Sequence, residues 1–206
     1  MTEEQWPASD IWREVLSTIP LPLNSRKTQL LVVAVCQHIP LHTSDLKTPA
    51  LLCVLEDFVD GRATRDAREQ ALNLIWDIGY SSMHTDPIAN LASTVNDEQL
   101  CPDPYSVIGD FLDSSVDNYN VPIATLFRDI FGNPFRPVTF SPGWRADTAM
   151  SLARGMYDAR EFSAMPILAD ALQDAGCDNT DVLTHCRDAK QIHVRGCWVV
   201  DLVLGL

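Results

Sequence analysis

The sequence predicts an all-α protein, a compact bundle of helical hairpins that forms either one domain or two packed lobes. Three observations lead to this prediction. Apolar residues recur at helical spacing, capping residues with glycine or proline mark the ends of these segments, and no segment sustains the alternation of a strand. A length of 206 residues with 46% hydrophobic content is sufficient for a buried core.

Three helices are expected in the first 80 residues. The first follows Asn24 or Ser25, either of which can cap a helix, and ends before Pro40. The second is closed by Gly61 and the third by Gly79. Because the second and third follow each other closely and each has an apolar face, we expect them to pair as a hairpin.

Short helices are expected after two Asp-Pro pairs in the middle of the chain. Asp86 and Asp103 each place a capping carboxylate before a proline, which is the favoured first helical residue. A longer helix is expected over residues 122–131. Residues 146–160 and 165–176 then predict another helical pair, and two shorter helices complete the tail. Residues 139–144 supply at most a short extended piece.

The connector after Gly132 is the best internal boundary. Asn133, Pro134 and Pro137 favour an extended path between helices. We therefore predict an N-terminal helical region with an acidic middle at 1–132 and a C-terminal helical region ending in a buried helix at 133–206. A single domain is the alternative.

The negative charge is concentrated in the middle of the chain. The net charge is −13, and residues 69–127 contain nine acids and no lysine or arginine. Such a field repels phosphate, so direct nucleic-acid binding is not expected. A docking face for a basic protein partner or a nucleic-acid mimic is one interpretation, and an ordinary solvated surface is the other.

The chain is expected to be cytoplasmic and to stay off membranes. Its first residues, MTEEQWPASD, do not resemble a secretory signal, and no apolar run approaches the roughly 20 residues that span a bilayer. The six cysteines are therefore interpreted as reduced thiols.

Long motifs in the second half resemble those of a bacterial family of proteins of unknown activity. They are RDIFGNPFRPV, LARGMYDAREFSAMPILADALQDAGCDN and HVRGCWVVDLVLG, and the likeness is strongest over residues 128–205. Near Cys36 the family has a cysteine pair followed by two arginines, and this chain departs from that pattern. The resemblance implies no catalytic residue.

The tail contains five side chains that could bind zinc. They are Cys177, His185, Cys186, His193 and Cys197, and tetrahedral zinc needs four donors. The short C-x2-C knuckle of most structural zinc sites is missing. We therefore expect no cofactor, with zinc as the alternative.

Packing into the core is the main interpretation of the tail. From Cys197 to Leu204 only Asp201 is polar, which predicts a buried helix containing Trp198. A buried carboxylate needs a partner, and Arg195, Arg187 or a protonated histidine could supply one. Asp201, Arg195 and Trp198 are thus expected to be structural residues.

A thiol nucleophile is the enzymatic alternative. Cys186 or Cys197 would need a nearby histidine and an orienting acid, for which His185, His193 and Asp201 are available in type. Catalytic thiols must also be accessible, whereas both cysteines adjoin apolar residues.

The connector also suggests a protein-binding surface. Arg128, Phe131, Phe135 and Arg136 could form an anchor for a partner, or the aromatic rings could pack internally while the arginines pair with Asp129 and other acids. We predict a non-enzymatic protein-interaction or regulatory protein. The alternatives are a zinc-stabilised helical module and a small thiol-dependent enzyme.

Overall fold

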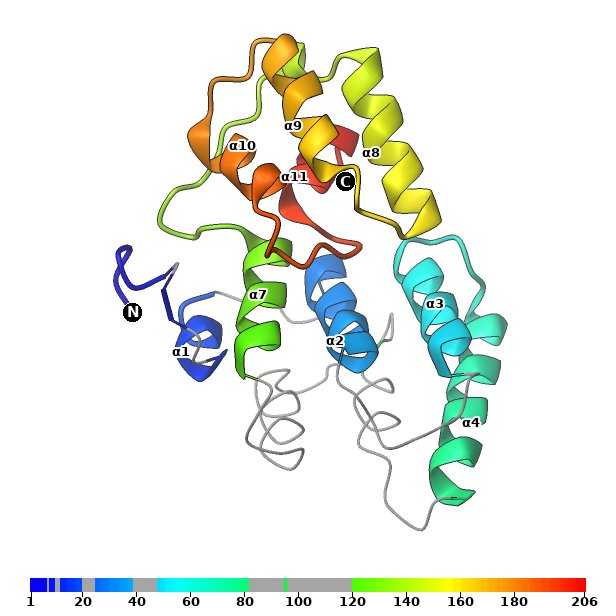
Figure 1. The fold of residues 1–206 in the computed structure, drawn as a ribbon. Coiled ribbons are helices and arrows are strands. Elements are labelled where there is room, and N and C mark those ends of the chain that lie inside the picture. The colour runs from blue at the N-terminus through cyan, green and yellow to red at the C-terminus, as the bar shows by residue number, and fades with distance from the viewer. Residues whose placement is uncertain (7, 10–11, 20–24, 39–47, 82–94, 96–119) are drawn as a thin grey trace. The chain divides into compact units, whose positions relative to one another are not determined.

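The computed structural model of the chain describes residues 1–6, 8–9, 12–19, 25–38, 48–81, 95 and 120–206 (Figure 1). The described residues form helices and no strand, which confirms the predicted all-α class. None of the helices in these ranges is long and apolar enough to cross a membrane.

The chain divides into two compact units. Met1–Ala8 joins Thr125–Leu206 in the C-terminal unit, and Ser9–Ala124 forms the other. The division falls inside one helix, α7 (Asn120–Phe131), and not after residue 132, where the connector predicted it. The sequence shows the proline-rich connector. It does not show the tertiary contacts that assign Met1–Ala8 to the C-terminal unit.

The unit Ser9–Ala124 contains four described helices: α1 (Trp12–Leu16), α2 (Arg26–His38), α3 (Thr48–Val59) and α4 (Arg65–Ser81). Helix α3 packs against both α2 and α4, which confirms the predicted hairpin. Helix α4 continues past Gly79, so the predicted stop there is wrong. One glycine costs a helix only about 1 kcal/mol, which packing can offset. The helices predicted after Asp86 and Asp103 lie outside the described residues.

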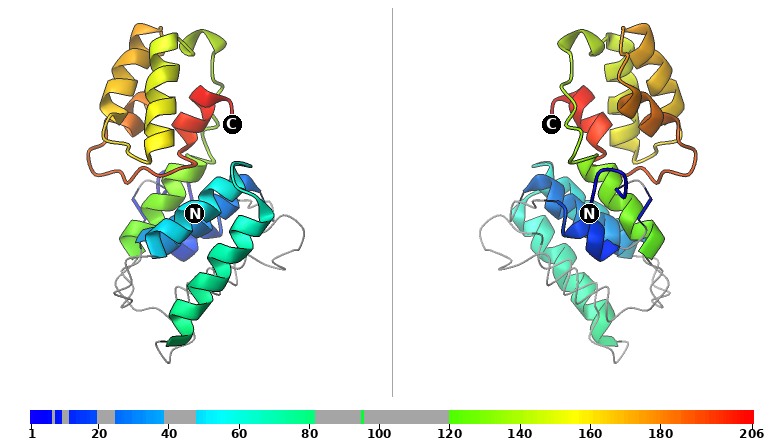
Figure 2. Two further views of the ribbon diagram at one scale, coloured as in Figure 1. Left: turned by 90° about the vertical axis from the view of Figure 1, so that its right-hand side faces the viewer. Right: turned by 90° about the vertical axis from the view of Figure 1, so that its left-hand side faces the viewer.

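The C-terminal unit contains the end of α7 followed by α8 (Asp147–Ala159), α9 (Met165–Asp174), α10 (Thr180–Arg187) and α11 (Trp198–Leu204). Helix α9 lies beside α8 and α10, while α11 packs against α8 and α10 (Figures 1 and 2). The predicted helical pair and the two short tail helices are confirmed. A single 3-10 turn at Pro142–Trp144 replaces the expected extended piece.

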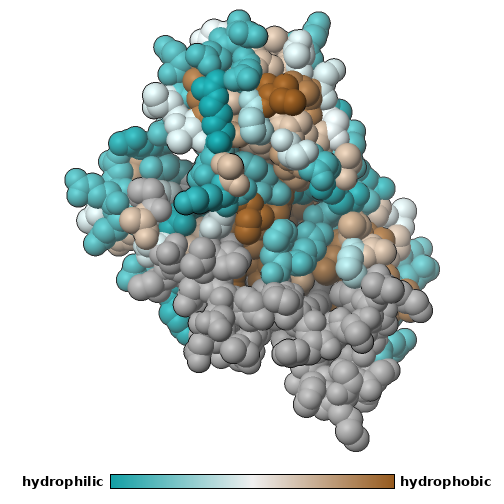
Figure 3. Space-filling model, in the orientation of Figure 1, coloured by the Kyte–Doolittle hydropathy of each residue, from teal (hydrophilic) through white to brown (hydrophobic). Residues whose placement is uncertain are grey.

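Helix α11 lies in the core of the C-terminal unit. Trp198, Val199, Val200, Asp201 and Val203 are all buried, as the apolar stretch predicts. Polar residues cover most of the described surface in the view of Figure 3, where apolar residues appear as separate spots. Three polar residues of this unit, Asp129, Arg195 and Asp201, are buried, and a buried charged group needs a partner.

Candidate metal centre

Four side chains of metal-binding type meet next to the start of α11. They are Asp129, His185, His193 and Cys197, called here the Asp-His-His-Cys cluster, and their ligand atoms all lie within 4.8 Å of one another. Asp129 and Cys197 are fully buried, and the side chains of His185 and His193 are only 10% and 7% exposed. One oxygen, two nitrogens and one sulfur thus converge in a nearly closed space.

The end of α7 and the tail from α10 to the start of α11 position these side chains. Asp129 lies near the end of α7, and His185 lies on α10, whose start is capped by the Asn179 side chain accepting from the Val182 amide at 3.0 Å. His193 lies in the loop after α10, and Cys197 is the cap residue of α11. The cluster therefore joins the end of α7 to residues 185–197 through contacts of Asp129 and does not depend on a local sequence motif.

The Asp129 carboxylate is the hub of the cluster. Its Oδ1 accepts hydrogen bonds from His193 Nδ1 at 2.7 Å and from His185 Nε2 at 3.2 Å. Its Oδ2 accepts from the Val194 amide at 2.9 Å. The backbone thereby fixes one carboxylate oxygen and turns the other toward both imidazoles.

The distances within the cluster bracket those of a tetrahedral zinc site. His185 Nε2 lies 3.3 Å from Cys197 Sγ, and that sulfur lies 3.9 Å from His193 Nδ1. Zinc bonds of roughly 2.0–2.3 Å place neighbouring donors about 3.3–3.6 Å apart. These four separations, from 2.7 to 3.9 Å, lie on either side of this spacing, and no two ligand atoms of the cluster are more than 4.8 Å apart.

The surroundings of the cluster favour opposite protonation states for the Asp129 carboxyl group and the Cys197 thiol. Burial tends to raise the pKa of Asp129, but hydrogen bonds and attraction from His185 and His193 outweigh it, so the pKa is lowered. Burial, together with the Asp129 charge, raises the pKa of Cys197 well above its ordinary value. Without an ion the carboxylate is therefore charged and the thiol protonated, whereas a bound cation would favour the thiolate.

Trp198 forms one wall of the cluster. Its ring lies 5.2 Å from the His185 ring, and the His185 ring lies 5.0 Å from that of His193. Gly132, at φ +68°, follows the end of α7 and lies next to Trp198, where an added Cβ would meet the indole at 3.2 Å. A glycine is required here both for its backbone conformation and for this close approach.

No protein-family model, curated protein or solved structure matches this chain. The resemblance to a bacterial family therefore stays a prediction, and inferences about function depend on the geometry of the site.

The structure brings together three of the five predicted metal candidates. His185, His193 and Cys197 belong to the cluster, whereas Cys177 and Cys186 are buried in the core outside it. Burial, followed by the Asp129 charge, raises the pKa of Cys186 to about 12. The predicted packing of thiols into the core thus holds for these two cysteines.

Sequence reasoning missed Asp129 as a member of the site. Its expected pairing with arginine is not what the cluster shows, because its oxygens accept from His185, His193 and Val194. The signal in the sequence was a single acid on an apolar helix face, between Phe127 and Ile130, which are both fully buried. Such an acid needs a polar partner from elsewhere in the chain.

The three predicted structural residues are buried. Asp201, Arg195 and Trp198 are 2%, 3% and 8% exposed. Arg195 Nε donates to the Tyr157 carbonyl at 3.1 Å, and its guanidinium lies over the Tyr157 ring. The predicted partner of the Asp201 carboxylate stays a prediction.

The predicted partner-binding residues connect the start of the chain to the C-terminal unit. Arg128 Nε donates to the Trp6 carbonyl at 2.9 Å, and Phe135 packs edge-on against the Trp6 ring. Arg136 pairs with Glu3 and with Asp181. These contacts hold Met1–Ala8 in place.

The same residues remain partly available to solvent. Phe135 is 38% exposed, and the Arg136 side chain is 57% exposed. Phe131 stacks against Phe127. A role of this connector in partner binding stays a prediction.

Proposed function

We propose that the protein binds a zinc ion at the Asp-His-His-Cys cluster and that this ion stabilises the fold of the C-terminal unit. The observation that carries the proposal is the meeting of four donor atoms of suitable type, within 4.8 Å of one another, in a nearly closed space. This is the zinc-stabilised helical module that the tail of the sequence suggested as an alternative.

The donor set favours zinc over other common ions. Calcium and magnesium prefer shells of oxygen, whereas thiolate and imidazole donors suit zinc. Asp129 contributes oxygen, His185 and His193 contribute nitrogen, and Cys197 contributes sulfur. Four such donors complete a tetrahedron.

A structural role fits the cluster better than a catalytic one. Catalytic zinc usually keeps one position open for water or substrate, and here protein side chains occupy all four. Because Asp129 comes from α7 and the other three donors lie between residues 185 and 197, an ion would join the end of α7 to the tail of the chain. Its binding free energy would then contribute directly to folding.

Burial argues against the thiol-enzyme alternative. Cys197 is fully buried and Cys186 is 1% exposed, and burial raises the pKa of both thiols. A thiol nucleophile needs access and a large thiolate fraction at neutral pH. Neither cysteine has these properties, which supports a non-enzymatic role.

A regulatory protein-interaction role is compatible with a zinc-stabilised module. The acidic face expected over residues 69–127 lies largely outside the described residues, so its basic partner stays a prediction. The cytoplasmic location also stays a prediction.

Metal analysis of protein purified without a histidine tag tests the proposal. About one zinc ion per chain is expected, and removal by a chelator should lower the melting temperature, with recovery when zinc is returned. Cobalt(II) in place of zinc should show thiolate-to-cobalt charge-transfer absorption. Absence of zinc from the purified protein, together with no uptake of added zinc or cobalt, would overturn the proposal.

Two cysteines provide a matched pair of variants for this experiment. Cys197→Ala should abolish both the bound zinc and the cobalt charge-transfer band. Cys186→Ala also removes a buried thiol from the same core, and it should keep both signals. Equal metal retention by the two variants would contradict the assigned ligands even if the chain binds zinc.

A further inference from the structure

We propose that the groove along α8 and the turn that leads into α9 binds a short amphipathic helix of another protein, with an apolar centre and basic residues at both ends. This surface lies in the C-terminal unit and shares no residue with the Asp-His-His-Cys cluster. The proposal is therefore independent of zinc binding.

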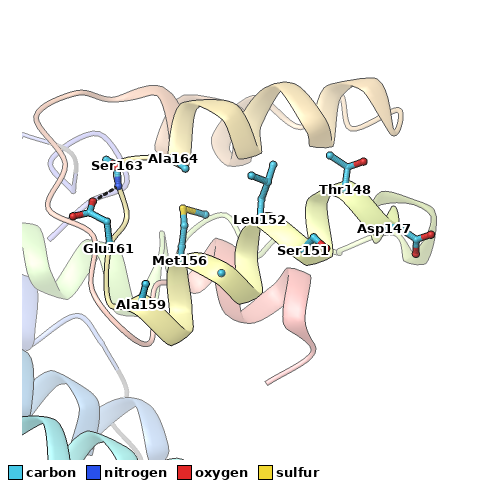
Figure 4. A pocket seen from close by; sticks show the side chains of 10 residues that line it. Asp147, Thr148, Ser151, Leu152, Met156, Ala159, Glu161, Ser163 and Ala164 are labelled. Carbon is cyan, nitrogen blue, oxygen red and sulfur yellow. Dashed lines mark hydrogen bonds between the residues drawn. The ribbon is translucent and has the colours of Figure 1, made fainter.

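The groove has an apolar floor. It encloses about 700 Å³, and Leu152 and Met156 project from α8 toward α9, where Ala164 faces them (Figure 4). Gly155 lies between them on α8, and an added Cβ there would meet nothing within 4 Å. The groove thus has room for a side chain from a partner.

The shape of the groove suits a helix. Helix α8 has 13 residues and is therefore about 20 Å long, which corresponds to roughly four turns of a bound helix. Ser151, Gly155 and Ala159 recur every four residues along the groove, so bulky side chains do not block the approach of another helix. Helix binding in an apolar groove is a common mode of peptide recognition.

Charge determines which helix would fit. Asp147 and Glu161 lie at the two ends of the groove, as Figure 4 shows, and both are exposed. The ten lining residues, all within the described part of the chain, include these two acids and no basic side chain. Lysine or arginine at both ends of a partner helix would complement them, whereas phosphate groups would be repelled.

Binding of synthetic peptides to the full 206-residue chain tests the proposal. The probe is a labelled helical peptide of about four turns, with leucines at i, i+3 and i+7 and lysines in the first and last turns. Fluorescence anisotropy should show saturable binding. A control peptide with glutamates in place of the lysines should bind at least about tenfold more weakly.

Gly155→Leu is the decisive variant. Its side chain should fill the open groove and lower the affinity for the lysine peptide at least about tenfold, while circular dichroism and melting show a folded protein. Asp147→Asn combined with Glu161→Gln should also weaken binding. Asp174→Asn removes an exposed charge outside the groove and should leave affinity unchanged.

Several outcomes would overturn the proposal. Equal binding of the two peptides, unchanged affinity in folded Gly155→Leu, or no saturation by the lysine peptide would each do so. A dimer of the chain that Gly155→Leu dissociates would show that a second copy occupies the groove instead.

Discussion

The Asp-His-His-Cys cluster and the groove along α8 lie in the same unit but differ in their exposure to solvent. The cluster places four polar atoms in a nearly closed space, where each must find a partner within the protein or in a bound ion. The groove places the half-buried Leu152 and the exposed Gly155 and Ala159 between two exposed acids. This difference in burial is the reason that we propose an ion for the first site and a polypeptide for the second.

Two glycines illustrate the same contrast at the level of single atoms. At Gly132 an added Cβ would approach the Trp198 indole to 3.2 Å, whereas at Gly155 it would meet nothing within 4 Å. The cluster side of the unit is closely packed and the groove side has free volume. Substitutions on the two sides should therefore have effects of different size and, at the glycines, of opposite sign.

The largest difference is expected between Trp198→Ala and Leu152→Ala. Trp198 is buried against the cluster, so its truncation should lower the free energy of unfolding by about 3–5 kcal/mol. Leu152 is half-buried at the groove, so Leu152→Ala should lower the free energy of unfolding by only about 1 kcal/mol. Urea denaturation monitored by circular dichroism measures both, and equal losses would contradict the packing difference.

Gly132→Ala should be the next most damaging change. A residue other than glycine in the left-handed region costs about 1–2 kcal/mol, and crowding against Trp198 adds to that cost. Gly176→Ala is the control because Gly176 has φ +88° with nothing within 4 Å of the added Cβ. If the two variants unfold at the same urea concentration, crowding of the new Cβ at position 132 against Trp198 does not contribute to the loss of stability.

Gly155→Ala should change stability in the opposite direction. Alanine is better than glycine inside a helix by about 1 kcal/mol, and the groove leaves room for its methyl group. The melting temperature should therefore rise slightly. A decrease would indicate that the groove is filled in the free protein.

The last prediction concerns Cys186, whose effect on the pH dependence of stability is absent at neutral pH and appears only above about pH 9. The folded chain holds the Cys186 proton to a pKa of about 12, above the ordinary value of 9.0. Between these values the unfolded chain binds fewer protons, so this contribution to stability is complete below about pH 9 and declines as the pH rises toward 12.

Unfolding experiments at a series of pH values check this linkage. The wild-type chain should lose stability above about pH 9 more steeply than Cys186→Ala does. At pH 8 a thiol reagent should modify Cys186 only after unfolding, as located by mass spectrometry. Rapid labelling of Cys186 in the folded chain would contradict its burial.

The helices could be predicted because their ends are encoded locally. Helix α2 starts beside Ser25, whose hydroxyl accepts from the Thr28 amide, and α7 ends before Gly132. The five-residue helix α1 escaped prediction because it is too short to show a period. The stop predicted at Gly79 was wrong by two residues, because a single glycine costs a helix only about 1 kcal/mol and α4 continues to Ser81.

The cluster could be predicted only in part. The residue types in the tail indicated His185, His193 and Cys197 as possible zinc ligands. They indicated Cys177 and Cys186 equally, and nothing in the sequence excludes these two. Asp129 lies 64 residues before His193, and no sequence pattern connects it to the tail. Only the tertiary structure brings its carboxylate to the imidazoles of His185 and His193.

The sequence by itself determined the helical class, the ends of most described helices and the burial of the last helix, because periodicity and capping act over a few residues. Only the tertiary structure decided which polar groups meet and which apolar residues stay open to solvent. Asp129 reaches His185 and His193, and Gly155 faces free space, through contacts between helices. Such contacts depend on the packing of the whole unit, which no local pattern specifies.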